Sequence, residues 1–304
     1  MKVTTVHPQK FSRITGQFSL RPRCRDILRS HDFSYRRLTD AEQEHTKILI
    51  RDATQKARPV DGADRKQAWE DCWLKNLSAY QLTPSEKSLV PDYLGAPYQR
   101  TLRLGGEFII PTDPKFHLNF WRALRAQLFD RWLTWPEPAT TVYELGSGSA
   151  WNLAAAREIL PKVKCYGLDW SPSAVALASL VGNGGWYFNL RQPTPVPTPD
   201  KFSVVTCGAL EQLGKEHEPL LTWLLQQKPS LCLHIEPLFE FYNALSQFDQ
   251  LAVDYHTARG YLSGFVPAIF KLMGAGKVEL LETRRVLFGG MYNEGYSYMV
   301  WRPR

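Results

Sequence analysis

The residues with the clearest chemical potential lie in one short stretch, from 140 to 171. Thr140–Leu145 has the β-branched and aromatic residues of a buried strand, and Gly146-Ser147-Gly148-Ser149 follows it at once. Glycines permit a tight turn and let a ligand lie against main-chain N–H groups. Asp169 comes about 20 residues later, where a carboxylate can accept hydrogen bonds from both hydroxyls of a ribose. The stretch therefore predicts a site for a nucleoside-containing ligand.

The elements between the glycines and Asp169 must position this site. Trp151–Leu160 has the pattern of a helix and is followed by Pro161, which ends it. Val163–Leu168 reads as a second buried strand. The order strand, glycine turn, helix, strand predicts a parallel sheet with a right-handed crossover.

Two common nucleotide sites do not fit the turn. A dinucleotide fingerprint needs Gly or Ala where this chain has Trp151, and no Gly-Lys-Ser/Thr follows as in a P-loop. Glu144 stands two residues before Gly146, where its charge would repel a phosphate but attract an ammonium group. The run Glu144 to Ser149, together with Asp169, resembles the first motif and the following acidic position of class I S-adenosylmethionine-dependent methyltransferases.

This resemblance implies an α/β fold with a Rossmann-like, doubly wound sheet that is mostly parallel and has an antiparallel C-terminal strand. It also implies S-adenosylmethionine as the cofactor, with Glu144 ordering its methionine end, Asp169 holding its ribose and Asn189 reading its adenine. The full set of cofactor contacts that it implies is Glu144, Gly146, Ser147, Gly148, Asp169, Trp170, Asn189, Leu190 and Cys207.

Methyl transfer to a hydroxyl also needs a base near the C-terminal edge of the sheet. The candidates are Glu211 after a predicted strand over 202–207, His217 in the following loop, Glu236 at the end of a predicted strand over 230–235, and His256 in a helix predicted within 252–274. Each has a structural alternative: a helix cap for Glu211, a surface loop for His217 and a core or solvated position for His256. We expect residues 255–261, which are polar and aromatic, to line the acceptor pocket. The sequence gives no sign of a metal cluster.

Three segments are expected: a basic arm over 1–37, a helical and loop segment over 38–114 that covers the substrate, and a cofactor-binding domain over 115–304. Periodicity predicts helices near 39–57, 64–80 and 119–135, with a short strand at 107–110. Trp69 and Trp73 are interpreted as core residues. Residues 252–274 predict one long helix or two, and strands over 277–288 and 297–301 close the sheet.

The charge is concentrated at one end of the chain. Residues 1–37 carry nine Lys or Arg against two Asp, which equals the whole formal charge of +7. We expect a solvated or loosely docked tail there, with contact to nucleic acid or an acidic partner as the alternative. The five cysteines are scattered and no apolar run reaches the roughly 18 residues of a membrane span, so a cytoplasmic protein is expected.

Three functions stay open at this point. The first is methyl transfer to a small-molecule hydroxyl of a sugar, a glycolipid head group or a secondary metabolite. The second is methylation of RNA or protein guided by the basic arm. The third is cofactor binding without catalysis, since a fold does not determine a function. The acceptor and the oligomeric state are not predicted.

Overall fold

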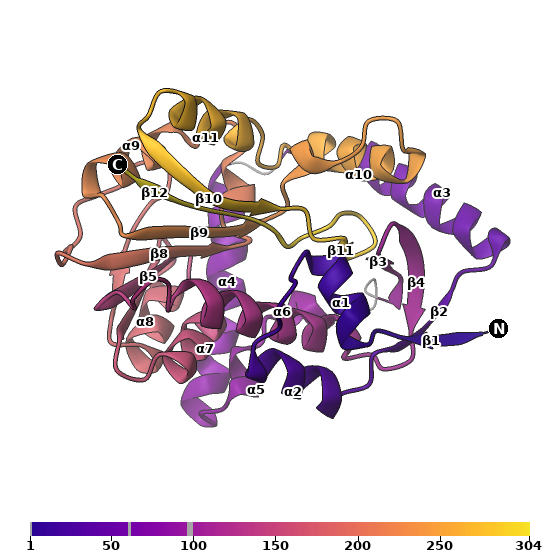
Figure 1. Ribbon diagram of the computed structural model, residues 1–304, viewed down its shortest axis with the longest axis horizontal. Helices are drawn as coiled ribbons and strands as arrows, with labels where there is room; N and C mark the ends of the chain where they lie inside the picture. Colours follow the sequence, from indigo (N-terminus) through magenta and orange to yellow (C-terminus); the bar gives the residue numbers. More distant parts are fainter. Residues whose placement is uncertain (1, 60–61, 96–99) are drawn as a thin grey trace.

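The computed structural model describes residues 2–59, 62–95 and 100–304 (Figure 1). Its main sheet has seven strands in the order β10-β12-β9-β8-β5-β6-β7. Five of them are parallel, and β12 runs antiparallel between β9 and β10. The fold is therefore the expected Rossmann-like α/β fold. The strand bounds are β5 Thr141–Leu145, β6 Lys164–Asp169, β7 Gly185–Tyr187, β8 Phe202–Cys207, β9 Leu231–Glu236, β10 Val278–Arg284 and β12 Ser297–Pro303.

Helices cover both faces of this sheet (Figure 1). One face carries α6 (Phe116–Trp132), α7 (Trp151–Ile159) and α8 (Pro172–Val181), and the other carries α9 (Glu218–Gln227) and α11 (Phe265–Gly274). The central strand β5 pairs with β6 on one side and β8 on the other, and all five of its residues are buried. The strand order reverses at β5, and ligands of doubly wound folds bind at the carboxyl ends of the strands at such a point.

A second, five-stranded sheet was not predicted from the sequence beyond one strand at 107–110. Its order is β1-β2-β4-β3-β11, and its pairs are antiparallel. The last strand, β11, lies between β10 and β12 in the chain, so the C-terminal segment returns to pair with the N-terminal one. The bounds are β1 Val3–Thr5, β2 Ser34–Arg37, β3 Leu102–Leu104, β4 Glu107–Pro111 and β11 Phe288–Gly289.

Residues 2–37 are folded, so the expectation of a solvated or loosely docked tail is wrong. Besides β1 and β2 they form α1 (Pro8–Thr15) and α2 (Pro22–Ser30). Phe11, Cys24 and Phe33 are buried in the same core as α6. Helices this short give too few repeats for a periodic pattern to be visible in the sequence.

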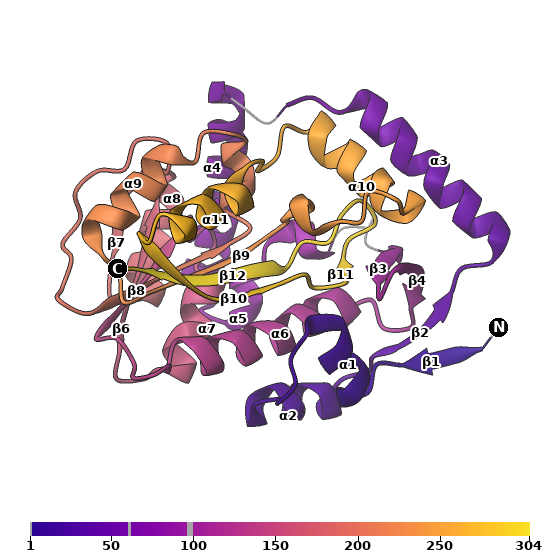
Figure 2. The ribbon, with the colours of Figure 1, turned by 45° about the horizontal axis from the view of Figure 1, so that its top comes forward.

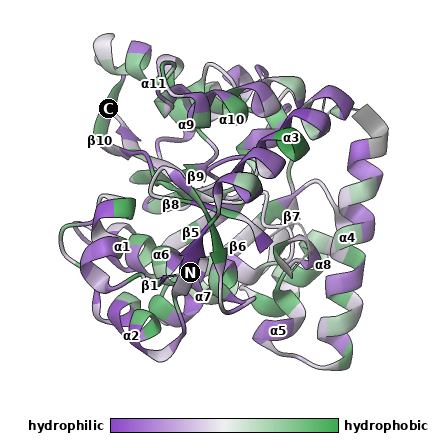
Figure 3. Ribbon diagram, turned by 90° about the vertical axis from the view of Figure 1, so that its right-hand side faces the viewer, coloured by the Kyte–Doolittle hydropathy of each residue, from purple (hydrophilic) through white to green (hydrophobic). Residues whose placement is uncertain are grey.

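The remaining helices surround the carboxyl edge of the sheet. Helix α3 (Asp40–Lys56) begins with a capping box between Thr39 and Glu42 and lies beside α10 (Gln247–Ala258) in both views (Figure 1, Figure 2). Helix α4 (Gly62–Leu82) alternates hydrophilic and hydrophobic residues along its length (Figure 3). It is followed by α5 (Glu86–Leu89) and the 3-10 turn η1 (Asp92–Gly95).

Helix α4 is fastened to the main domain by Glu70. Its carboxylate accepts hydrogen bonds from the hydroxyls of Ser171 and Ser173 at 2.6 and 2.5 Å, at the start of α8. The two helices α10 and α11 are separate, which is one of the two arrangements expected for 252–274. Among the described residues, no helix has the length and apolar character needed to cross a bilayer.

Candidate functional site

The turn after β5 depends on its two glycines. Gly146 and Gly148 have φ angles of +70° and +50°, which residues with a side chain rarely adopt. A Cβ on Gly146 would lie 2.4 Å from that of Ala209, and one on Gly148 would lie 2.8 Å from the ring of Trp73. Both positions are therefore closed to larger residues by conformation and by space.

Asp169 at the end of β6 is tied directly to this turn. Its Oδ2 accepts from the backbone N–H of Gly148 at 2.9 Å, and its Oδ1 accepts from that of Ser171 at 2.9 Å. Burial raises the pKa of the Asp169 carboxyl to about 6, although both hydrogen bonds oppose the shift. The carboxylate is thus held at the turn, with lone pairs left for a ligand.

Glu144 lies within β5, two residues before Gly146 of the turn. Its Oε1 accepts from the amide of Asn152 at 3.0 Å, while its Oε2 has no partner among the described residues. Burial raises the pKa of this carboxyl to about 8. Glu144 does not line the cavity described next, but Asn152 does, so Glu144 reaches it through this amide.

A cavity of about 740 Å³ opens at the carboxyl edge of the sheet. Its volume lies in the range of small-molecule and cofactor sites. One wall consists of the glycine turn, Asp169 and the segments that follow β7 and β8. Eight of the nine expected cofactor residues line it: Gly146, Ser147, Gly148, Asp169, Trp170, Asn189, Leu190 and Cys207.

Of the four candidate bases, only Glu211 lines the cavity. It belongs to the 3-10 turn η3 (Leu210–Leu213) after β8, and its Oε1 accepts from Gln212 Nε2 at 2.7 Å. Burial raises the pKa of the Glu211 carboxyl to about 7, against the opposing positive charge of Arg65. A carboxyl with this pKa can hold or release a proton near neutral pH.

The other three candidates point into the protein, so the structure does not place them where sequence reasoning expected. Glu236 is fully buried and accepts from the N–H of Ala209 at 3.2 Å. His256 lies 2.7 Å from the carbonyl of Leu262 through Nε2, and burial lowers its pKa to about 4. His217 packs against Phe265. None of the three lines the cavity.

The rest of the cavity wall comes from segments outside the methyltransferase-like motif. The sequence interpretation expected only residues 255–261 there, and both tyrosines of that segment line the cavity. Trp69 and Trp73 of α4 line the cavity, and Trp73 is also buried, as its interpretation as a core residue expected. Tyr93 of η1 and Trp121 of α6 join them there. The spacing of Trp69 and Trp73 shows that they share a helix face, but not whether that face meets protein or a cavity.

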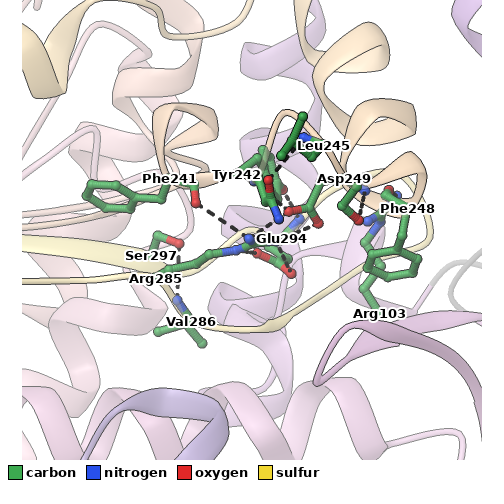
Figure 4. Close-up of polar contacts among 12 residues, drawn as sticks. Arg103, Phe241, Tyr242, Leu245, Phe248, Asp249, Arg285, Val286, Glu294 and Ser297 are labelled. Atoms are coloured by element: carbon green, nitrogen blue, oxygen red, sulfur yellow. Dashed lines mark hydrogen bonds and ion pairs between the residues drawn. The ribbon is translucent and has the colours of Figure 1, made fainter.

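A loop between β11 and β12 completes this wall, and a buried ionic cluster holds it (Figure 4). Arg285 donates two hydrogen bonds of 2.7 Å to Asp249 of α10 and pairs with Glu294 of the loop at 2.7 Å. Arg103 of β3 donates to the carbonyl of Met291 at 3.2 Å. Residues 290–293, 295 and 296 line the cavity, so the cluster fixes the shape of this wall.

Comparison with known protein structures shows a similar fold at low sequence identity. No family model and no curated protein matches the chain. The N-methyltransferase NodS from Bradyrhizobium japonicum WM9, in complex with S-adenosyl-L-homocysteine, is 11% identical over 60% of this chain and 87% of that one, with a TM-score of 0.45.

Human N-acetylserotonin methyltransferase in complex with SAM is 14% identical over 84% of this chain and 66% of that one, with a TM-score of 0.44. The mitomycin 7-O-methyltransferase MmcR is 13% identical over 79% of this chain and 70% of that one, with a TM-score of 0.42. At these values the function has to be argued from the site itself.

Proposed function

We propose that this protein binds S-adenosylmethionine and transfers its methyl group to a hydroxyl of a small molecule. The observation that carries the proposal is one cavity that is lined both by a nucleoside-type site and by a candidate base. Asp169 and the glycine turn form the nucleoside-type site, and Glu211, in the segment that follows β8, is the candidate base.

The residues at the turn fit such a cofactor. Asp169 offers a buried carboxylate to the ribose hydroxyls, and Gly146 and Gly148 line the same cavity. The hydroxyl of Ser147 and the Oε2 of Glu144 are buried without partners among the described residues, which suits a polar ligand end. We place the methionine end near Cys207 and the adenine near Asn189 and Leu190, following the resemblance.

When bound, the cofactor supplies a methyl group on a sulfonium sulfur, which is its own leaving group. The chain then has to orient the acceptor and take up its proton. Glu211 suits the second task because its carboxyl has a pKa of about 7 and lines the cavity. The acceptor is expected to lie beside Glu211, in the part of the cavity lined by the segment that follows β8.

Calorimetry with the wild-type protein tests the cofactor. S-adenosylhomocysteine is expected to bind in the micromolar range, and NAD and ATP are expected to bind at least tenfold more weakly. Failure of S-adenosylhomocysteine to bind the folded protein, or tighter binding of NAD, would contradict the proposal. Transfer of a labelled methyl group to a pool of small-molecule hydroxyls then distinguishes an enzyme from a protein that only binds the cofactor.

A further inference from the structure

Aromatic side chains from four separate parts of the chain, within residues 69–93, at 121, within 255–261 and within 292–296, form one part of the cavity wall. We propose that this wall, which we call the aromatic wall, binds a planar aromatic hydroxyl compound, a phenol of one or two rings, as the methyl acceptor. The inference rests on the proposed function and narrows its substrate class, which the sequence left open between sugars, glycolipid head groups and secondary metabolites.

The first group of rings comes from α4 and η1. Trp69 and Trp73 stack with centroids 5.1 Å apart and planes 12° apart, and Tyr93 meets both edge-on at 6.0 and 6.5 Å. All three line the cavity. Stacked and edge-on arrangements are those that aromatic rings prefer, so a further planar ring can join this group favourably.

The second and third groups come from α6, α10 and the loop held by the ionic cluster. Trp121 stacks on Tyr296 at 4.7 Å with planes 13° apart. Tyr255 stacks on Tyr292 at 4.5 Å, and Tyr261 meets Tyr255 edge-on at 6.3 Å. These five rings also line the cavity. A flat ligand therefore meets aromatic surface from several directions.

Glu211 lines the same cavity as the three groups. Its backbone carbonyl accepts from the N–H of Leu262, next to Tyr261, at 3.1 Å. A ring bound among these groups places a hydroxyl substituent within reach of the Glu211 carboxylate.

Some polar groups beside the aromatic wall already bond to each other, which disfavours a sugar. His117 Nε2 lies 2.7 Å from the hydroxyl of Tyr296. Arg65 donates to Gln212 at 2.8 Å, and Gln212 donates to Glu211 at 2.7 Å. A sugar brings several hydroxyls that lose water on binding and need partners here, whereas a phenol brings one.

The atoms and electrons of the proposed methyl transfer to a phenol can be accounted for as follows. The phenolic oxygen forms a bond to the methyl carbon while the carbon–sulfur bond breaks and sulfur keeps the electron pair. The phenolic proton passes to the carboxylate of Glu211 and from there to water.

Matched probes test the substrate class in the protein saturated with S-adenosylhomocysteine. By calorimetry, 2-naphthol is expected to bind at least tenfold more tightly than decahydro-2-naphthol, which has the same connectivity but no aromatic rings. Methyl glucoside is expected to bind more weakly than both. Equal binding of the first two, tighter binding of the glucoside, or no binding of 2-naphthol overturns the inference. If S-adenosylhomocysteine itself does not bind, the proposed function has failed instead.

Variants of the aromatic wall locate the binding. Trp121→Leu is expected to lose about tenfold of the 2-naphthol affinity and to keep the affinity for S-adenosylhomocysteine, while Trp121→Phe keeps both. Trp135→Leu is the control, because Trp135 is partly exposed and lies outside the cavity. Tyr292→Leu serves if the buried Trp121 cannot be replaced without unfolding. Unchanged 2-naphthol affinity in the cavity variant that folds would refute the assignment.

Discussion

Replacing Asp169 with Asn tests most directly whether its carboxylate binds the ribose of the proposed cofactor. The proposed ribose would donate two hydrogen bonds to the buried carboxylate, and hydrogen bonds to charged groups contribute about 1.5–3 kcal/mol each. With the lower value for both, Asp169→Asn costs about 3 kcal/mol, which corresponds to roughly a 100-fold rise in the dissociation constant of S-adenosylhomocysteine. Calorimetry at pH 7.5 measures this directly.

The pH dependence gives a second, independent readout of Asp169. Burial raises its pKa to about 6, so in the free protein the carboxyl is neutral below that pH. Ribose hydroxyls bind the ionised form better, because it accepts without competing for protons. The wild-type affinity should therefore fall as the pH drops below about 6 and level off above it, and the Asn variant should lack this dependence.

A control separates loss of the site from loss of the fold. Asp254→Asn removes an exposed carboxylate of α10 that does not line the cavity, and it should leave the affinity unchanged. The Asn variant must also retain a cooperative thermal transition, since Asp169 accepts two backbone hydrogen bonds. A folded Asp169→Asn protein that binds S-adenosylhomocysteine within threefold of the wild type would refute the ribose assignment.

Three further substitutions address the turn, the base and the ionic cluster. Gly148→Ala is expected to weaken S-adenosylhomocysteine binding at least tenfold in calorimetry, because the residue has a φ of +50° and the new Cβ meets a tryptophan ring at 2.8 Å. Glu211→Gln should lower kcat about 10²–10⁴-fold for an accepted hydroxyl probe and abolish the rise of kcat/KM through about pH 7, with cofactor affinity retained. Arg285→Met should destabilise the protein by about 3–5 kcal/mol in denaturant unfolding, because it leaves two buried carboxylates unpaired.

Each of these substitutions has a matched control. Gly274→Ala adds a Cβ with no atom within 4 Å and should leave cofactor binding unchanged. Glu218→Gln changes an exposed carboxylate of α9 outside the cavity and should keep the pH profile. Arg302→Met breaks a more exposed pair with Glu279 and should cost less than about 1 kcal/mol. Equal effects in a variant and its control would contradict the corresponding prediction.

The part of the cavity formed by the glycine turn and Asp169 could be predicted from the sequence, because its residues lie close together in the chain. A strand, a glycine turn, a helix and a second strand fix where Gly146 and Asp169 lie relative to each other, whatever the rest of the chain does. The hydrogen bond from Gly148 to Asp169 is the direct result.

The aromatic wall could be predicted only in part, because it is assembled from segments far apart in the chain. Residues 255–261 were expected to line an acceptor pocket, and both of their tyrosines line the cavity. The spacing of Trp69 and Trp73 places both on one helix face, but only the packing of α4 on α8 shows that this face meets the cavity. The same limit explains His256: its helix was placed correctly, yet its ring turns inward to the carbonyl of Leu262. Sequence periodicity shows which residues share one face of a helix, and tertiary packing decides what that face contacts.

The N-terminal segment is part of the same assembly and cannot be treated as a separable arm. Phe11 and Phe33 lie in the core shared with α6, and β2 pairs with β4 in the sheet that β11 joins. Removing residues 1–37 would therefore expose that core and remove two strands from the sheet that supports the cavity loop. A role of the basic charge in binding nucleic acid has to be examined in the folded protein, through substitution of exposed arginines of α2 such as Arg25 and Arg29. Loss of activity on truncation would report unfolding, and only a salt-dependent effect of those substitutions would support a guiding function for the charge.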